Sequence, residues 1–185
     1  MGETPLLRAG VVDYEAIANT GLTSEDFGET VSTAWAREYR RAVADAELVE
    51  VDLDGLTYLF DLKLNRTLGV YGLSRGQTAP RPSGRLRGHP SYNRPGEAPT
   101  DRGHLAAHSI GGVADLNLVA QDHFLNISGG WRAFERYAQK HPGTPFAVQA
   151  RYLGESDRPS SFVYAQLRDS RFIYREFDND PSTAA

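Results

Sequence analysis

The stretch TDRGHLAAHS, residues 100–109, places an Asp, an Arg, a Gly and two His side chains close together in the chain. It follows a segment, residues 74–100, that is rich in Gly, Pro, Ser and Arg and has no hydrophobic period, which predicts a long loop. Loops of this length in compact domains are usually either functional or disordered. His104, preceded by Arg102 and Asp101, is therefore the first candidate for a catalytic group, and the alternative is the polar start of a helix.

The segments on either side carry regular hydrophobic patterns. A helix is predicted where apolar residues recur at helical spacing behind a Thr23 or Ser24 cap, and a hairpin where they alternate around Asp54-Gly55. The expected elements are a helix at 21–47, the hairpin at 47–65, a strand at 67–74, a helix at about 131–140, and a meander of strands at 145–154, 160–168 and 171–178. Helices and antiparallel strands in this order indicate an α+β fold.

The composition limits the kinds of function that the chain can have. Its 185 residues, 40% hydrophobic and 24% charged, suit one soluble domain with a small N-terminal appendage. The lack of Cys excludes disulfides, thiolate zinc sites and cysteine nucleophiles. No apolar run is long enough to span a membrane, and MGETPLLRAG lacks the pattern of a secretory signal.

Charge is distributed unevenly along the chain. The net charge is −4, yet residues 63–103 hold eight basic and two acidic side chains. A local positive field of this kind attracts a polyanion, while arginines that only solubilise a loop are an equally supported alternative.

Two kinds of metal site are compatible with the histidines and amides of the central segment. His104 and His108 are four residues apart and would share one face of a helix, with His123 as a third zinc ligand, but HLAAH lacks the Glu of the zinc-protease motif. Oxygen atoms, which suit Mg²⁺, are offered instead by five side chains that follow within about thirty residues: Asp115, Asn117, Asp122, Asn126 and Glu135. With a His, an Arg and a basic approach segment, they are the groups needed for metal-assisted attack on a phosphodiester.

Three motifs in order resemble one known family. They are DRGH (101–104), NLVAQDHFLN (117–126) and Trp131-x-x-x-Glu135. Together they resemble the DNA/RNA non-specific endonucleases with a ββα-metal, or His-Me finger, site, in the branch found among bacterial secreted toxin domains. The similarity runs from about residue 57 to 178. It implies an antiparallel sheet with a ββα-metal core in a domain at 51–180, an N-terminal helical extension at 1–50 and a disordered tail at 181–185.

The resemblance also implies a role for each matching residue. His104 would be the general base that activates water, and imidazole suits this role because its reference pKa, about 6.5, is near neutral. Arg102 would neutralise charge on the phosphoryl oxygens, and Glu135 would hold a water molecule next to the ion. Asn126 would bind one Mg²⁺, replaceable by Mn²⁺, that stabilises the leaving 3′-oxygen. Asn117 would join that metal site or position the backbone near His104.

Further expectations concern partners and location. Arg87, Arg94 and Arg102 are expected to contact phosphates of DNA and RNA without reading sequence, and Trp131 is expected in the core. The resemblance implies a domain secreted or delivered into a target cell, with an immunity protein as a partner and no contact with a membrane. Without a signal in this chain, a cytoplasmic location is the other expectation.

The sequence leaves two points open. The stretch NISGGW is one residue longer than the family's usual spacing. Either the Gly129-Gly130 pair absorbs the extra residue, or the helix starts late and Asn126 lies in a loop. The alternative function is a catalytically inactive nucleic-acid-binding module of the same fold. The presence of His104, Asn126 and Glu135 together argues against it.

Overall fold

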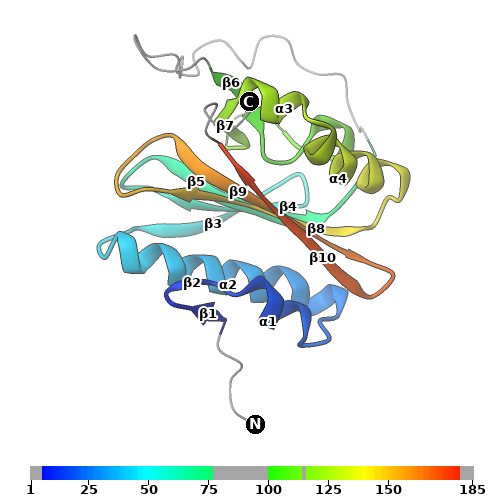
Figure 1. Cartoon of the computed structure of the whole chain (residues 1–185), viewed down its shortest axis with the longest axis horizontal. Coiled ribbons are helices and arrows are strands. Elements are labelled where there is room, and N and C mark those ends of the chain that lie inside the picture. The colour runs from blue at the N-terminus through cyan, green and yellow to red at the C-terminus, as the bar shows by residue number, and fades with distance from the viewer. Residues whose placement is uncertain (1–5, 77–99, 114–115, 180–185) are drawn as a thin grey trace.

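A central antiparallel sheet carries the α+β fold of the chain (Figure 1). The computed structural model of the chain describes residues 6–76, 100–113 and 116–179. The strands of the sheet are β3 (Leu48–Leu53), β4 (Leu56–Asp61), β5 (Arg66–Leu73), β8 (Pro145–Tyr152), β9 (Pro159–Arg168) and β10 (Arg171–Asp178). They are ordered β10-β9-β8-β5-β4-β3, and every neighbouring pair is antiparallel. The predicted hairpin, strand and terminal meander are thereby confirmed.

The sheet consists of two meanders that meet at its centre, where β5 pairs with β8. Between these two strands the chain leaves the sheet and forms an insert. The described elements of this insert are β6 (Thr100–His104), the 3-10 helix η1 (His108–Ile110), β7 (Leu118–Asp122), α3 (His123–Ile127) and α4 (Gly129–Lys140). Its two ends are held together because Ser74 N donates to Thr144 O at 2.9 Å and Gly143 N donates to Ser74 O at 2.7 Å.

The N-terminal elements cover one face of the sheet (Figure 1). They are β1 (Leu7–Arg8), β2 (Val11–Val12), α1 (Tyr14–Ala18) and α2 (Ser24–Ala42). The predicted helix is confirmed with Thr23 as its cap, although it ends at Ala42 rather than near residue 47. Its buried Trp35 lies directly over Gly69 of β5, where an added Cβ would come within 2.4 Å of the indole. The small residue therefore lets α2 pack close to the sheet.

The insert covers the opposite face (Figure 1). Helix α4 buries Trp131, Phe134 and Ala138 against the sheet. The Trp131 ring meets Phe162 and Tyr164 edge-on at centroid distances of 5.6 and 5.2 Å. The expectation that Trp131 belongs to the core is confirmed, and its burial fixes which side of α4 faces away from the sheet.

Because both faces are covered, alternate residues of the central strands enter two separate cores. In β9, for example, Phe162 and Tyr164 belong to the core under the insert, whereas Val163 and Ala165 belong to the core under α2. Strands buried on both faces have nearly continuous apolar sequences, which explains runs such as SFVYA.

The boundaries predicted from the sequence lie between residues 50 and 51 and between residues 180 and 181. Strand β3 starts at Leu48, so that the sheet already begins within residues 1–50. The loop at 77–99, with Arg87 and Arg94, and the tail at 181–185 lie outside the described residues. No helix of the described part is long and apolar enough to cross a membrane.

Candidate active site

The stretch TDRGH forms a strand, not the start of a helix. Residues Thr100–His104 make β6, which pairs antiparallel with β7 so that His104 lies opposite Leu118 and Arg102 opposite Ala120. Gly103 is required between them for a steric reason. The fully buried side chain of Gln121 lies over it, and a Cβ on Gly103 would come within 2.1 Å of Gln121 Oε1.

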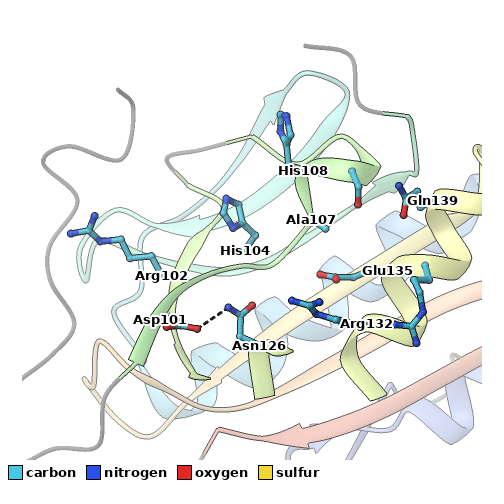
Figure 2. A pocket seen from close by; sticks show the side chains of 11 residues that line it. Asp101, Arg102, His104, Ala107, His108, Asn126, Arg132, Glu135 and Gln139 are labelled. Atoms are coloured by element: carbon cyan, nitrogen blue, oxygen red, sulfur yellow. Dashed lines mark hydrogen bonds between the residues drawn. The ribbon is translucent and has the colours of Figure 1, made fainter. Parts of the chain in front are cut away.

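A cavity of about 560 Å³ opens between β6, η1, α3 and α4 (Figure 2). It brings together Arg102, His104, Asn126 and Glu135, four of the residues that the sequence singled out. The lining residues are Asp101, Arg102, His104, Ala107, His108, Ser109, Asn126, Arg132, Glu135, Arg136 and Gln139. Strand β6 thus supplies one wall, and the two helices supply the other.

Asn126 is held in position by a carboxylate. Its Nδ2 donates to Asp101 Oδ2 at 3.0 Å, and the same oxygen lies 2.9 Å from Nδ1 of His123. With Nδ2 engaged in this way, the neutral Oδ1 of Asn126 is the acceptor of the amide, and neutral amide oxygens suit hard divalent cations. The amide therefore fits a divalent metal in this cavity.

The expectation of a late helix and a loop at Asn126 is wrong. Asn126 lies on α3, and α4 begins at Gly129 rather than at about Trp131. The extra residue of NISGGW is absorbed at Ser128, which ends α3 and caps α4, its Oγ accepting from Trp131 N at 3.2 Å.

Glu135 enters the cavity from α4 with one oxygen already engaged. Its Oε1 accepts from Trp131 Nε1 at 3.0 Å, so that the buried indole anchors the carboxyl group. Burial raises the pKa of Glu135 above its ordinary value, and the hydrogen bond from Trp131 and the charges of Arg132 and Arg136 act in the opposite direction. A carboxyl group in this environment can accept a hydrogen bond or exchange a proton.

Asn117 has a different environment from the one that a metal ligand needs. It is fully buried on the segment before β7 and does not line the cavity. Its Oδ1 accepts from Ala106 N at 2.8 Å, and its Nδ2 donates to Ala106 O at 2.7 Å and to Val113 O at 2.8 Å. The geometry corrects the metal-ligand assignment of Asn117, because its amide holds the backbone that follows His104.

The three histidines considered for zinc do not form such a site. His123 lies against Asp101, and Nδ1 of His108 lies 3.2 Å from Gly112 O. Among residues 6–76, 100–113 and 116–179, no three His, Cys, Asp or Glu side chains gather as a metal-binding group.

Sequence reasoning missed part of the helical wall. Arg132, Arg136 and Gln139 line the cavity together with Glu135. They stand at positions i, i+3, i+4 and i+7 of α4, a pattern that places residues on one face of a helix. The sequence contains the helical spacing of these residues, but the packing of α4 is needed to show that this face lines the cavity.

Comparisons with known proteins identify the family of the chain. Residues 49–168, more than half of the chain, match the family described as DNA/RNA non-specific endonuclease. No curated protein matches the chain. One similar solved structure is described as an extracellular endonuclease, with 19% identity, a TM-score of 0.40, and coverage of 75% of this chain and 71% of that one. Another, an extracellular nuclease, has 17% identity, a TM-score of 0.42, and coverage of 74% and 86%. The chain therefore belongs to the DNA/RNA non-specific endonuclease family, whose members are nucleases.

Proposed function

We propose that the chain is a metal-dependent nuclease that hydrolyses phosphodiester bonds of DNA and RNA without sequence preference, and that the cavity is its active site. The observation that carries the proposal is the meeting of His104, Asn126 and Glu135 in one cavity, from β6, α3 and α4. Membership of the family supports nucleic acid as the substrate.

His104 is the proposed general base. Its side chain is partly exposed and lines the cavity, where an imidazole nitrogen can take a proton from an attacking water molecule. Asn117 supports this role indirectly, because its hydrogen bonds hold Ala106 and Val113 in the turn after His104.

Asn126 is the proposed protein ligand of a single divalent cation, Mg²⁺, in a ββα-metal arrangement of β6, β7 and α3. Such an ion would neutralise negative charge on the leaving 3′-oxygen. Asp101 on β6 orients Asn126 by accepting a hydrogen bond from its Nδ2, and Glu135 on α4 can hold water by accepting a hydrogen bond.

Arg102 is the proposed contact to phosphoryl oxygens on the β6 side, where it is exposed at the rim of the cavity. Phosphates are the same at every step of a nucleic acid, so that contacts to them fix the register of the substrate without reading its sequence. Arg87 and Arg94 are proposed as additional phosphate contacts on the basis of the sequence alone.

The test is a cleavage assay on plasmid DNA and on RNA in Mg²⁺, in Zn²⁺ and in EDTA. We expect cutting in Mg²⁺, no cutting in EDTA, and a loss of about 10²–10⁴-fold in rate for His104→Ala. His141→Ala is the matched control, because His141 is exposed, stacks on Tyr137 and lies outside the cavity lining.

Three outcomes would count against this function. Cleavage by His104→Ala at the rate of the parent would remove the proposed base. Binding of nucleic acid without cutting in any metal would favour the inactive binding module. Activity with Zn²⁺ alone that is lost in His108→Ala would favour the zinc reading.

We also propose, from the resemblance of the motifs, that the domain is a secreted or delivered toxin neutralised by an immunity protein. An acidic partner would complement the arginines around the cavity. Induced expression of the parent chain in bacteria should stop growth, expression of His104→Ala should not, and co-expression of the neighbouring gene should restore growth. Unimpaired growth with an active enzyme would contradict the toxin role alone.

A further inference from the structure

Helix α4 presents one continuous polar stripe to the cavity. Arg132, Glu135, Arg136 and Gln139 all line it, at positions i, i+3, i+4 and i+7. The adjoining side of the helix is fixed in the core by Trp131, Phe134 and Ala138. The stripe therefore cannot rotate away from the cavity without unpacking that core.

The guanidinium groups of Arg132 and Arg136, the two arginines of the stripe, bind no other residue in the part of the chain that the structure describes. Neither guanidinium forms a hydrogen bond or an ion pair there. Both are close enough to Glu135 for their positive charges to lower the pKa of its carboxyl group. Arg151 shows the contrast, because its Nε lies 3.1 Å from Glu38 and its Nη1 2.7 Å from Glu176. Arg132 and Arg136 are thus cations at a cavity wall with their donors available.

Arg132 on α4 and Arg102 on β6 belong to different walls of the cavity and point in different directions. Figure 2 shows Arg132 reaching into the space between Asn126 and Glu135, whereas Arg102 extends from β6 away from α4. An anion beside Asn126 and His104 would meet the guanidinium of Arg132. Arg136 lies four residues further along the helix, a rise of about 6 Å.

We propose that Arg132 and Arg136 bind two adjacent phosphates of one substrate strand, so that this strand runs along α4 during cleavage. Arg132 contacts the scissile phosphate, and Arg136 contacts the adjacent phosphate of the same strand. A guanidinium presents a planar fork of donors that matches phosphate oxygens, which favours arginine for such contacts. Gln139, at the end of the stripe, is neutral and marks where the charged track stops. This inference rests on the proposed function of the cavity.

The first test measures binding, so that it does not depend on catalysis. A labelled single-stranded oligonucleotide of mixed sequence is titrated with the His104→Ala protein in EDTA over a range of salt concentrations. For single strands, each neutralised phosphate adds about 0.7 to the slope of log affinity against log salt. We expect Arg132→Ala and Arg136→Ala each to lower the slope by about 0.7, and the double variant by about 1.4.

Arg40→Ala is the matched control for the loss of one positive charge. Arg40 is exposed in the last turn of α2, on the face of the sheet opposite the cavity. We expect it to leave the slope unchanged. Three results would overturn the proposal. They are slopes of both cavity variants that do not differ from that of the His104→Ala parent, slopes equal to that of Arg40→Ala, and no measurable binding by the His104→Ala parent.

The second test separates the two arginines by their kinetics in the catalytically competent chain. Arg136→Ala should raise KM with kcat within roughly twofold, because it removes a contact that is equal in the ground and transition states. Arg132→Ala should lower kcat by roughly tenfold or more, because its phosphate changes charge in the reaction. A uniform loss of both parameters in both variants, with lowered unfolding midpoints, would indicate a structural role and overturn the assignment.

These outcomes also separate this inference from the proposed function. If the chain binds with the expected slopes but never cuts, the nuclease mechanism is refuted, while the binding of a strand along α4 by Arg132 and Arg136 is still supported. If the chain cuts normally while the slopes of Arg132→Ala and Arg136→Ala stay unchanged, only the binding of the strand along α4 is refuted.

Discussion

Replacing Gly103 with Ala tests whether the close packing of β6 on β7 controls the catalytic strand. An added Cβ would lie 2.1 Å from Gln121 Oε1, 2.5 Å from its Cβ and 2.9 Å from its Cδ. The end of a long side chain could move aside, but the Cβ of Gln121 is attached to the backbone of β7. The two strands must therefore separate.

The expected cost follows from these overlaps. Overpacking a close-packed site costs about 1–3 kcal/mol. The restricted unfolded chain of an Ala variant offsets about 0.4–1 kcal/mol of this. We expect a net loss of about 1–2 kcal/mol in the free energy of unfolding. Because His104 follows Gly103 directly, we also expect kcat/KM to fall by roughly 100-fold if the strand moves by about 1 Å.

Urea unfolding followed by tryptophan fluorescence measures the stability term, since Trp35 and Trp131 are both buried, one on each face of the sheet. Gly129→Ala is the matched control, because a Cβ at Gly129 meets nothing within 4 Å and the position lies in the first turn of α4. We expect the control to be neutral or up to about 1 kcal/mol more stable.

A second substitution identifies the cause. In Gly103→Ala with Gln121→Gly, the overlapping atoms are absent, so that the two changes should couple by about 0.5–3 kcal/mol. The reasoning is refuted if Gly103→Ala is as stable as Gly129→Ala, or if the costs of the two substitutions simply add.

Three further outcomes are expected. Burial raises the pKa of Glu135 above its ordinary value of 4.5, so that its ionised form is less favourable in the folded state than in the unfolded state. The contribution of Glu135 to stability should therefore fall as pH rises through its folded-state pKa. Glu135→Gln should be more stable than the parent at pH 7, and this gain should vanish below about pH 4. Urea unfolding midpoints of the parent and of Glu135→Gln, measured across this pH range, test the expectation. A difference between the two midpoints that does not change with pH would contradict the expected direction of the pKa shift. Asn117→Ala should cost about 3 kcal/mol or more of unfolding free energy, because Ala106 and Val113 lose hydrogen-bond partners in a buried turn, and a cost below about 1 kcal/mol in the same assay would contradict the role given to this amide. Removal of residues 1–43 should abolish cooperative unfolding, since α2 covers one face of the sheet, and a truncated chain with a sharp urea transition would show that the first layer is dispensable.

Much of the fold could be predicted from local sequence. The alternation around Asp54-Gly55 predicted the hairpin, and both residues have the positive φ, 50° and 73°, that tight hairpin turns require. Helix α3 could not be predicted, because at five residues it is too short to show a period. The pairing of β5 with β8 was also out of reach, since partner choice between distant strands leaves no local pattern.

The site divides in the same way. His104, Asn126 and Glu135 could be chosen from motifs, and they line one cavity. The role of Asn117 depended on its burial, which a motif does not reveal. Arg132 and Arg136 follow a helical period, but only the packing of Trp131 determines that their face is the cavity wall.

The hydrogen bonds between Ser74 and the segment Gly143–Thr144 have a consequence for the order of folding. Each meander contains only hairpins, which form within about 1–10 μs. Joining the meanders at β5 and β8 closes a loop of roughly 70 residues, at an entropic cost of about 4 kcal/mol. Until then, β5 and β8 are unpaired sheet edges, which are prone to aggregation. We therefore expect the slow step of folding to be this closure, and the cavity to form only when it is complete.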